Sequence, residues 1–278
     1  MINTLFVNGC SWTEGYLLHE EPHVKEYAAT LGYEFFGVLE AKKNGEPVPY
    51  PFLEIFNEFN WAGTVAKELS IPTIVNHAVG GGSNPRIVRT TMEYVRALTE
   101  EQKKETLVVI GWSLPDRNEL YLDDKHGNSL WFLFNAAQPF NTLTPSELFE
   151  KSFIERMSKF WESYVIDVHN NYSSIYNFFQ QSELLANFLE NQGIKYYFFN
   201  TFPVFWGIHD VEQSKQEELQ KLATYYNNRY SVLPTTDTFA EFVNDKKELR
   251  LSDGHPNSLA YKLWAQHIIK DMKELGLL

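Results

Sequence analysis

Four polar stretches of this sequence carry the side-chain types that acyl transfer needs. They are "GCS" at 9–11, "NHAVGGGSN" at 76–84, "GWSLPDRNE" at 111–119 and "SDGHPNSLAY" at 252–261. Together they supply a hydroxyl, a run of glycines, a polar strand end and an aspartate close to a histidine. Acyl transfer needs a nucleophile, an imidazole within hydrogen-bond reach, an orienting carboxylate and donors for the developing oxyanion. The four stretches therefore predict an acyl-transfer site, provided that the fold brings them together.

Each stretch also has a plain structural interpretation. Ser11 is a favoured helix N-cap, and Cys10 is typical of a small buried side chain at a strand end. The glycines at 80–82 suit a tight turn, and residues 253–256 suit a turn before a helix that Asn257 would cap. Pairing of Ser11 with a distant histidine is what favours chemistry over these alternatives.

Four short apolar runs predict strands that are buried on both faces. They lie at 4–9, 72–79, 106–112 and 195–201, and a weaker fifth candidate lies at 230–235. Continuous runs rich in β-branched and aromatic residues are typical of parallel strands covered by helices. Three of the four polar stretches follow such a run, so we expect them at the carboxyl edge of a sheet, where open α/β sheets bind ligands.

Helical periodicity lies between the strand candidates, at 61–70, 84–102, about 146–192 and 257–276. Asn84 and Pro85 stand where an N-cap and a first-turn proline belong, and Gly193 stands where the third pattern should end. In the last helix we expect five side chains to face the core: Leu259, Leu263, Trp264, Ile268 and Met272.

Strands that alternate with helices predict an α/β protein, a three-layer α/β/α sandwich around a mostly parallel five-stranded sheet. The sequence has no internal repeat, low-complexity tract or Pro/Gly/Ser-rich linker, so we expect a single domain over 1–278. Two aromatic-rich segments, about 31–60 and 121–145, fit neither pattern. We expect them to be loop insertions that rise from the carboxyl edge of the sheet.

The order of the polar stretches resembles that of the motif blocks of the SGNH (GDSL-like) hydrolase family. "NGCS" at 8–11 stands where that family usually has Gly-Asp-Ser, and "NHAVGG" at 76–81 resembles its second block. "GWSLPD" at 111–116 resembles the third block, usually Gly-x-Asn-Asp, and "DGHPN" at 253–257 resembles the fifth. The resemblance covers nearly the whole chain and implies a flavodoxin-like α/β/α fold and a serine esterase, in a divergent member of bacterial or phage type.

The resemblance also implies a role for particular residues. Ser11 falls at the nucleophile, and His255 falls at the general base. The implied donors of the oxyanion hole are the Ser11 and Gly81 amides, together with the Ser113 hydroxyl, which stands where the family usually has an asparagine side chain. Asn76 matches the asparagine that stands five residues before the oxyanion glycine.

Two departures from the family pattern concern the nucleophile turn and the oxyanion hole. Cys10 replaces an aspartate that supports the turn, which should alter packing more than chemistry. Ser113 can donate one hydrogen bond but reaches less far than asparagine, so Asn84 is a further candidate for the hole.

A third departure concerns the acid of the triad. The family usually places it three residues before the histidine, where this chain has Ser252. Asp253 is the nearest substitute, and Asp116, after the third strand candidate, is the alternative.

These assignments predict hydrolysis of an acyl ester without a cofactor or metal ion. Asn84, Trp12 and Trp112 are the expected substrate contacts, and aromatic-rich loops that could stack on sugar rings favour a carbohydrate O-acetyl ester. A glycan-binding or structural module that keeps the fold without turnover is the alternative, and an acyltransferase is a third, weaker possibility.

Composition limits the partners that we expect. With 36 acidic and 24 basic residues the net charge is −12, which disfavours binding to nucleic acid. The single cysteine cannot form an internal disulfide, and Pro22 between His19 and His23 argues against a helical metal-binding pair. No apolar run is long enough to cross a bilayer and no signal peptide is evident, so we expect a cytoplasmic or virion-associated protein.

Overall fold

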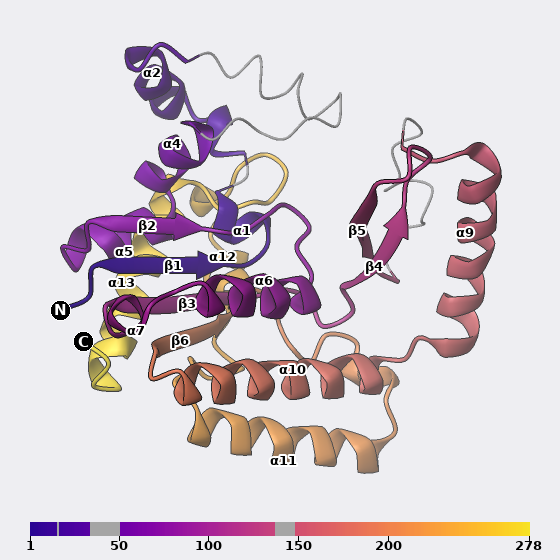
Figure 1. The fold of residues 1–278 in the computed structure, drawn as a ribbon. Coiled ribbons are helices and arrows are strands. Elements are labelled where there is room, and N and C mark those ends of the chain that lie inside the picture. The colour runs from indigo at the N-terminus through magenta and orange to yellow at the C-terminus, as the bar shows by residue number, and fades with distance from the viewer. Residues whose placement is uncertain (16, 34–50, 137–147) are drawn as a thin grey trace.

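A four-stranded parallel sheet with the strand order β2-β1-β3-β6 lies at the centre of the molecule (Figure 1). The computed structural model describes residues 1–15, 17–33, 51–136 and 148–278. The strands are β1 (Thr4–Asn8), β2 (Thr73–Asn76), β3 (Thr106–Trp112) and β6 (Lys195–Asn200). In register, Leu5 of β1 lies opposite Ile74 of β2 and Leu107 of β3. The four stronger strand candidates of the sequence are confirmed.

The weaker candidate at 230–235 forms no strand. Val232 makes a single parallel bridge to Phe198 of β6, and Leu233 donates its amide to the Phe198 carbonyl. The next amide that could donate to β6 is that of Thr235, and it donates to the Asn227 side chain at 3.3 Å instead, so the pairing does not continue. The described sheet therefore has four strands and not the five that were expected.

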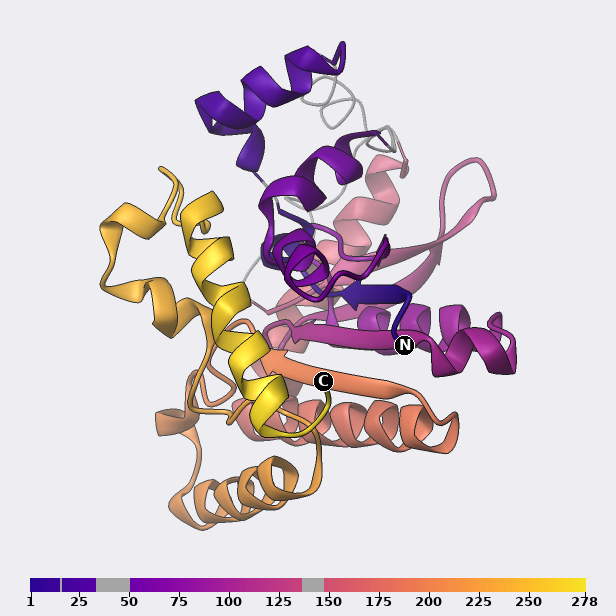
Figure 2. The ribbon, with the colours of Figure 1, turned by 90° about the vertical axis from the view of Figure 1, so that its left-hand side faces the viewer.

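Helices cover both faces of the sheet, which confirms the α/β/α arrangement. Leu5 and Val7 of β1 face a core with α5 (Trp61–Glu68) and α13 (Ser258–Glu274). Phe6 faces a second core, formed with α6 (Asn84–Arg96), α10 (Asn171–Asn191) and α11 (Gln213–Arg229). Both chain termini lie at the amino end of the strands, so the carboxyl edge is at the far side of the sheet (Figures 1 and 2).

Two of the expected helices are divided. The pattern at 84–102 splits into α6 and α7 (Glu100–Lys104), because Thr99 begins a new helix through a capping box with Gln102. Ser83, and not Asn84, is the N-cap of α6, and its side chain accepts a hydrogen bond from the Arg86 amide.

The stretch at 146–192 also splits. It forms α9 (Lys151–Ser163), a π-helical turn (Tyr164–Val168) and α10, which Asn170 caps. Gly193 has φ +67°, a left-handed conformation that suits the expected helix end.

The inward face of α13 was predicted in part. Trp264, Ile268 and Met272 are buried, but Leu259 and Leu263 are 49% and 37% exposed. The buried positions recur as the pairs 260/261, 264/265 and 268/269, so Leu259 and Leu263 each lie one residue before the buried face. Smaller or less obvious side chains complete the buried face instead: Ala260, Tyr261, Ala265 and Ile269.

The two segments expected as loop insertions contain regular structure where they are described. Residues 34–50 and 137–147 lie outside the described residues. The rest of the first segment includes α4 (Pro51–Phe59), and the second includes most of an antiparallel hairpin of β4 (Asn118–Asp123) and β5 (Ser129–Phe134).

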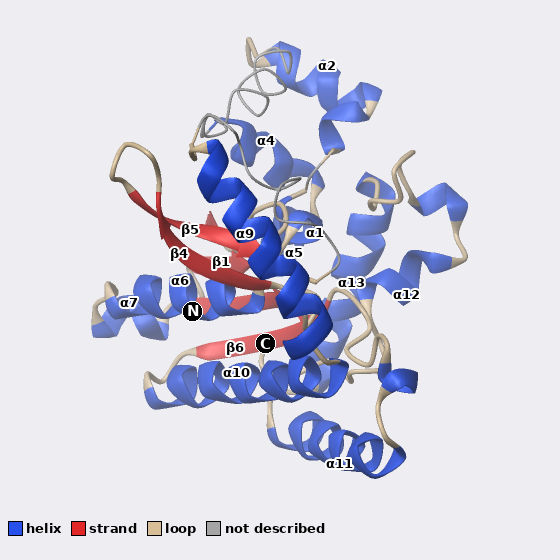
Figure 3. Ribbon diagram, turned by 90° about the vertical axis from the view of Figure 1, so that its right-hand side faces the viewer, coloured by secondary structure: helices blue, strands red, loops and turns tan. Residues whose placement is uncertain are grey.

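Helix α9 packs on this hairpin through a small separate core that contains Phe132, Phe134 and Phe149 (Figure 3). Phe132 and Phe134 of the second segment thus help to attach α9, whereas Tyr121 and Trp131 are exposed. The short helices complete the fold: α1 (Ser11–Glu14), α2 (Pro22–Thr30), α12 (Phe239–Asn244) and 3-10 turns at Leu18–Glu20, Ile208–Asp210 and Lys247–Leu249.

Candidate active site

Ser11 is the first residue of α1, in the turn that follows β1. The strand ends at Asn8, and Cys10 occupies the N-cap position of the short helix. A Cβ atom on Gly9 would lie 2.2 Å from the Thr13 hydroxyl and 2.8 Å from the Gly111 carbonyl oxygen. Because no larger residue fits there, the chain can turn tightly and present Ser11 at the carboxyl edge of the sheet.

Ser11 lies in hydrogen-bond contact with His255. The distance from the Ser11 hydroxyl oxygen to His255 Nε2 is 3.1 Å, although 244 residues separate the two. His255 belongs to a turn before α13, in which the Leu251 amide donates to the His255 carbonyl and Gly254 has φ +93°. The turn thus directs the imidazole toward the end of β1.

Asp253 contacts His255 twice. Its Oδ2 lies 2.7 Å from the ring Nδ1, and its Oδ1 accepts a hydrogen bond from the His255 backbone amide at 3.0 Å. A carboxylate on Nδ1 favours the tautomer whose proton is on Nδ1, which makes Nε2, the atom that faces the Ser11 hydroxyl, a hydrogen-bond acceptor. Asp116, the alternative acid, lines a cavity beside the site, and the Nδ1 position that it would need is taken by Asp253.

The glycine-rich turn after β2 packs against the nucleophile turn. The Val79 amide donates to the Gly9 carbonyl at 3.3 Å, and a Cβ atom on Gly82 would lie 2.7 Å from the same oxygen. Gly81 has φ +76°. Within the described residues, the amides of Ser11 and Gly81 have no acceptor, so both N–H groups are available to a ligand.

Ser113 and Asn84 form a closed pair at the end of β3. Asn84 accepts a hydrogen bond from the Ser113 amide and donates to the carbonyls of Ser113 and Leu114, both at 3.2 Å. Asn84 is 1% exposed and its amide hydrogens are used in this way, so it neither contacts substrate nor completes the hole. The Ser113 hydroxyl accepts from Arg117 at 3.0 Å, which leaves its own proton uncommitted.

The two tryptophans expected at the substrate have different positions. Trp112 is fully buried in the core on the α10 side, where it packs against Phe178 and Phe198, so it cannot touch a substrate. Trp12 lies at the site, with its ring centroid 6.1 Å from that of His255 and an edge-to-face contact with Phe239.

A cavity of about 440 Å³ opens beside Ser11 and His255. Trp12 and Gly254 belong to its wall, and most of the other side chains are apolar. The wall residues from the loop after β6, and those between Ala240 and Arg250, were not predicted from the sequence. The lining comprises Trp12, Leu114, Pro115, Asp116, Asn171, Ser174, Ile175, Phe202, Trp206, Ala240, Val243, Asn244, Arg250 and Gly254.

Cys10 points away from the site. Its side chain is fully buried in the core that α5 and α13 share with β1. Tyr261 lies in the same core, where burial raises the pKa of its hydroxyl well above the usual value. The Cys10 side chain is therefore part of the core and not of the cavity wall.

Neither a metal centre nor a membrane span is found in the described part of the chain. No three His, Cys, Asp or Glu side chains there gather closely enough to hold an ion. His19 and His23 belong to different elements, because Pro22 begins α2 after the 3-10 turn that holds His19. None of the helices in these residues combines the length and the apolar character that crossing a bilayer requires.

Comparison with known proteins gives one family and several distant structural matches. A model described as a family of unknown function, DUF6071, matches residues 43–272. No curated protein sequence matches the chain. A structure of TesA aligns over 99% of both chains with 14% identity and a TM-score of 0.47. The psychrotrophic esterase EstA of Pseudoalteromonas sp., inhibited by monoethylphosphonate, aligns over 98% of both with 10% identity and a TM-score of 0.48. A member of the lipolytic protein G-D-S-L family from Veillonella parvula aligns over 96% of both, with 11% identity and a TM-score of 0.41.

Proposed function

We propose that this chain, which belongs to the DUF6071 family, is a serine hydrolase that cleaves acyl esters. The observation that carries the proposal is the continuous contact from Ser11 through His255 to Asp253, at 3.1 and 2.7 Å. A hydroxyl, an imidazole and a carboxylate in this order are what an activated serine nucleophile requires.

In the proposed acylation step, Nε2 of His255 accepts the hydroxyl proton as Ser11 Oγ bonds to the ester carbonyl carbon. Asp253 stabilises the imidazolium that forms. The carbon–oxygen bond to the alcohol then breaks, and His255 returns the proton to the departing alcohol oxygen. A water molecule repeats the sequence on the acyl-enzyme, which releases the carboxylic acid and restores Ser11.

The proposed oxyanion hole consists of the Ser11 and Gly81 amides. Both N–H groups lack an acceptor within the described residues, and the contact of the glycine turn with Gly9 holds the two turns together. The Ser113 hydroxyl is the proposed third donor. Asn84 contributes indirectly, because its hydrogen bonds to residues 113 and 114 fix the loop that carries this hydroxyl.

The narrower form of the proposal is a carbohydrate O-acetyl esterase. The observation in its favour is Trp206, which is 67% exposed on the cavity wall and offers a face on which a sugar ring can stack. Asp116, Asn171 and Asn244 on the same wall are polar groups of the kind that hold sugar hydroxyls.

A second candidate substrate is an ester with an apolar chain. Leu114, Ile175, Phe202, Ala240 and Val243 make much of the cavity wall apolar. The cavity is also larger than an acetyl group needs, since an apolar cavity of about 150 Å³ already holds benzene. Comparison of p-nitrophenyl octanoate with an O-acetylated oligosaccharide separates the two candidates.

Hydrolysis of p-nitrophenyl acetate by the wild type, Ser11→Ala and Cys10→Ala tests the proposed function. We expect Ser11→Ala to abolish turnover and Cys10→Ala to retain it, and we expect a phosphonate inhibitor to label Ser11. Equal rates for the wild type and Ser11→Ala would exclude the serine mechanism, and loss in Cys10→Ala alone would point to the thiol. If neither substitution matters and the protein still retains a polysaccharide, it is a glycan-binding module.

A further inference from the structure

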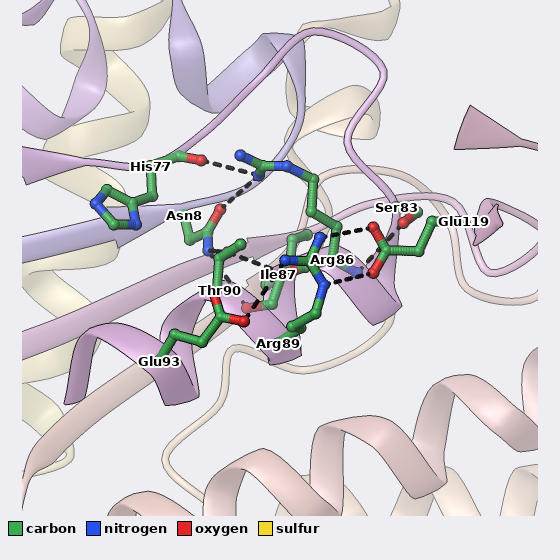
Figure 4. Close-up of polar contacts among 9 residues, drawn as sticks. All are labelled: Asn8, His77, Ser83, Arg86, Ile87, Arg89, Thr90, Glu93 and Glu119. Atoms are coloured by element: carbon green, nitrogen blue, oxygen red, sulfur yellow. Dashed lines mark hydrogen bonds and ion pairs between the residues drawn. The ribbon is translucent and has the colours of Figure 1, made fainter. Parts of the chain in front are cut away.

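Arg86, near the start of α6, connects the two turns of the candidate active site (Figure 4). Its Nη1 donates to the His77 carbonyl at 2.9 Å and approaches Asn8 Oδ1 at 3.4 Å. His77 directly follows β2 and precedes the glycine turn, whereas Asn8 ends β1 and precedes the nucleophile turn. One guanidinium thus contacts the ends of two adjacent strands.

Asn8 extends this connection into helix α6. It is fully buried, and its Nδ2 lies 2.8 and 3.1 Å from the hydroxyls of Thr90 and Thr91. Its Oδ1 accepts the Gly9 amide at 2.9 Å in addition to the contact with Arg86. The position of the Gly9 peptide, two residues before Ser11, is therefore fixed by a side chain that α6 holds in place.

Arg86 also lies against the glycine turn itself. It lines a cavity of about 240 Å³ together with Gly80, Gly81 and Gly82. Burial lowers the pKa of Arg86, and Glu119, Glu14 and Glu93 partly offset that effect. A planar guanidinium with several fixed donors is suited to joining two backbone segments, because its hydrogen-bond directions are rigid.

We propose that Arg86 is a positioning residue that sets the spacing between the nucleophile turn and the glycine turn, and so assembles the oxyanion hole. It acts through the His77 carbonyl and through Asn8, and it does not contact the substrate. This inference rests on the proposed ester hydrolysis. A displacement of about 1 Å in such a site can cost on the order of 10²-fold in rate, so a residue that fixes two turns affects kcat more than KM.

Arg89 provides a matched control on the same helix. It pairs with Glu119 through two hydrogen bonds of 3.0 Å and lies 4.3 Å over the Trp131 ring (Figure 4 shows the pair with Glu119). Both partners belong to the β4–β5 hairpin, so loss of Arg89 removes a half-buried arginine contact without touching the ends of β1 or β2. A general effect of destabilising α6 would appear in Arg89→Ala as well.

The test is steady-state kinetics of Arg86→Ala, Arg86→Lys and Arg89→Ala on p-nitrophenyl acetate, with hydrogen exchange as a second readout. We expect Arg86→Ala to lower kcat about 10- to 100-fold with KM changed less than about threefold. Arg86→Lys should recover part of the loss, because an ammonium can still donate to the His77 carbonyl. Arg89→Ala should stay within about threefold of the wild type.

Hydrogen exchange does not depend on turnover. Arg86→Ala should speed exchange at residues 8–12 and 77–83, and Arg89→Ala should instead affect the hairpin. Equal kcat in Arg86→Ala and Arg89→Ala, or unchanged exchange at the two turns, would overturn the inference. If Arg86→Ala fails to fold, the inference is tested with Arg86→Lys by the same two measurements, kcat and hydrogen exchange at the two turns. Wild-type rates in Ser11→Ala would instead refute the ester hydrolase, whatever the Arg86 variants do.

Discussion

Asp253 holds His255 at two points, with one carboxylate oxygen 3.0 Å from the backbone amide and the other 2.7 Å from the ring nitrogen Nδ1. The two residues are separated by a single glycine, so the carboxylate and the imidazole belong to one turn. The carboxylate that contacts the ring therefore needs no distant loop to bring it there. Asp237 and His267 form a second Asp–His pair at 2.8 Å, across 30 residues, which offers a comparison outside the site.

Asp253→Asn should lower kcat by about 10²- to 10⁴-fold, because the amide removes the charge that stabilises the imidazolium and can favour the wrong tautomer. Steady-state kinetics on p-nitrophenyl acetate measure the loss. Asp237→Asn is the control and should stay within about twofold of the wild type. A larger loss of kcat in Asp116→Asn than in Asp253→Asn would mean that Asp116, and not Asp253, is the acid of the triad.

Gly81→Ala should lower kcat by more than its loss of folding stability can explain. Gly81 and Gly127 both have left-handed backbones, with φ +76° and +81°, so the backbone strain of alanine should cost each site a similar amount, about 1 kcal/mol. A Cβ on Gly81 would meet Leu133 at 3.0 Å, whereas one on Gly127 would meet nothing within 4 Å. We expect kcat to fall about 10- to 100-fold in Gly81→Ala alone. Equal kcat in the two variants would show that Gly81 is not part of the oxyanion hole.

Asp271→Asn should stabilise the protein at neutral pH. Burial raises the pKa of Asp271, although its Oδ2 accepts a hydrogen bond from the Tyr197 hydroxyl at 2.8 Å. A raised carboxyl pKa means that the charged form is disfavoured in the folded state. The cost is absent below the ordinary value of 3.8, grows as pH rises toward the folded-state pKa and is full above it.

Thermal melts at pH 7 should therefore show a midpoint about 1–3 °C higher for Asp271→Asn, and the gain should shrink toward pH 4. Asp167→Asn is the control, because Asp167 is exposed. A gain that does not change with pH would mean that the substitution acts through packing and not through charge.

Much of the sheet could be predicted from sequence because its strands are short apolar runs that end in polar residues. The side to which Trp112 points could not, since the run at 106–112 is apolar at nearly every position and shows no alternation. The failure of the fifth strand could not be predicted, because the pairing ends where the Thr235 amide donates to the Asn227 side chain, which is a tertiary contact.

The hairpin of β4 and β5 was missed, because residues 121–145 were expected to be a loop, although a signal for it is present. Two apolar runs flank a glycine-containing turn at 124–127, which is a hairpin signal.

The chemical contacts of the site were predictable as residue types, but their geometry depends on tertiary structure. Ser11 and His255 were expected to meet because their stretches resemble two blocks of one family, and they lie 3.1 Å apart. Asn84 looked like a free amide in sequence, yet it is fully engaged with the end of β3. Phe202 and Trp206 could have been suspected, because they directly follow β6 at the same sheet edge.

Ala240→Trp tests whether the cavity beside Ser11 holds the larger part of the substrate. Ala240 lies on α12 and lines the cavity near Trp12 and Phe202, so a tryptophan there should fill part of the 440 Å³. We expect kcat/KM for p-nitrophenyl octanoate to fall at least about tenfold, since each methylene kept out of an apolar cavity loses roughly fourfold in binding. The acetate ester has a much shorter acyl chain, so its hydrolysis should change less than about threefold.

Trp206→Ala is the complementary variant. Its side chain is largely exposed, so its removal should leave folding intact and should weaken hydrolysis of an O-acetylated oligosaccharide about fivefold if a sugar stacks there. Loss of octanoate hydrolysis in Ala240→Trp with no effect of Trp206→Ala on the oligosaccharide identifies an ester with an apolar chain. The reverse pattern identifies the carbohydrate ester, and no effect of either variant on any substrate would show that the ester binds outside this cavity.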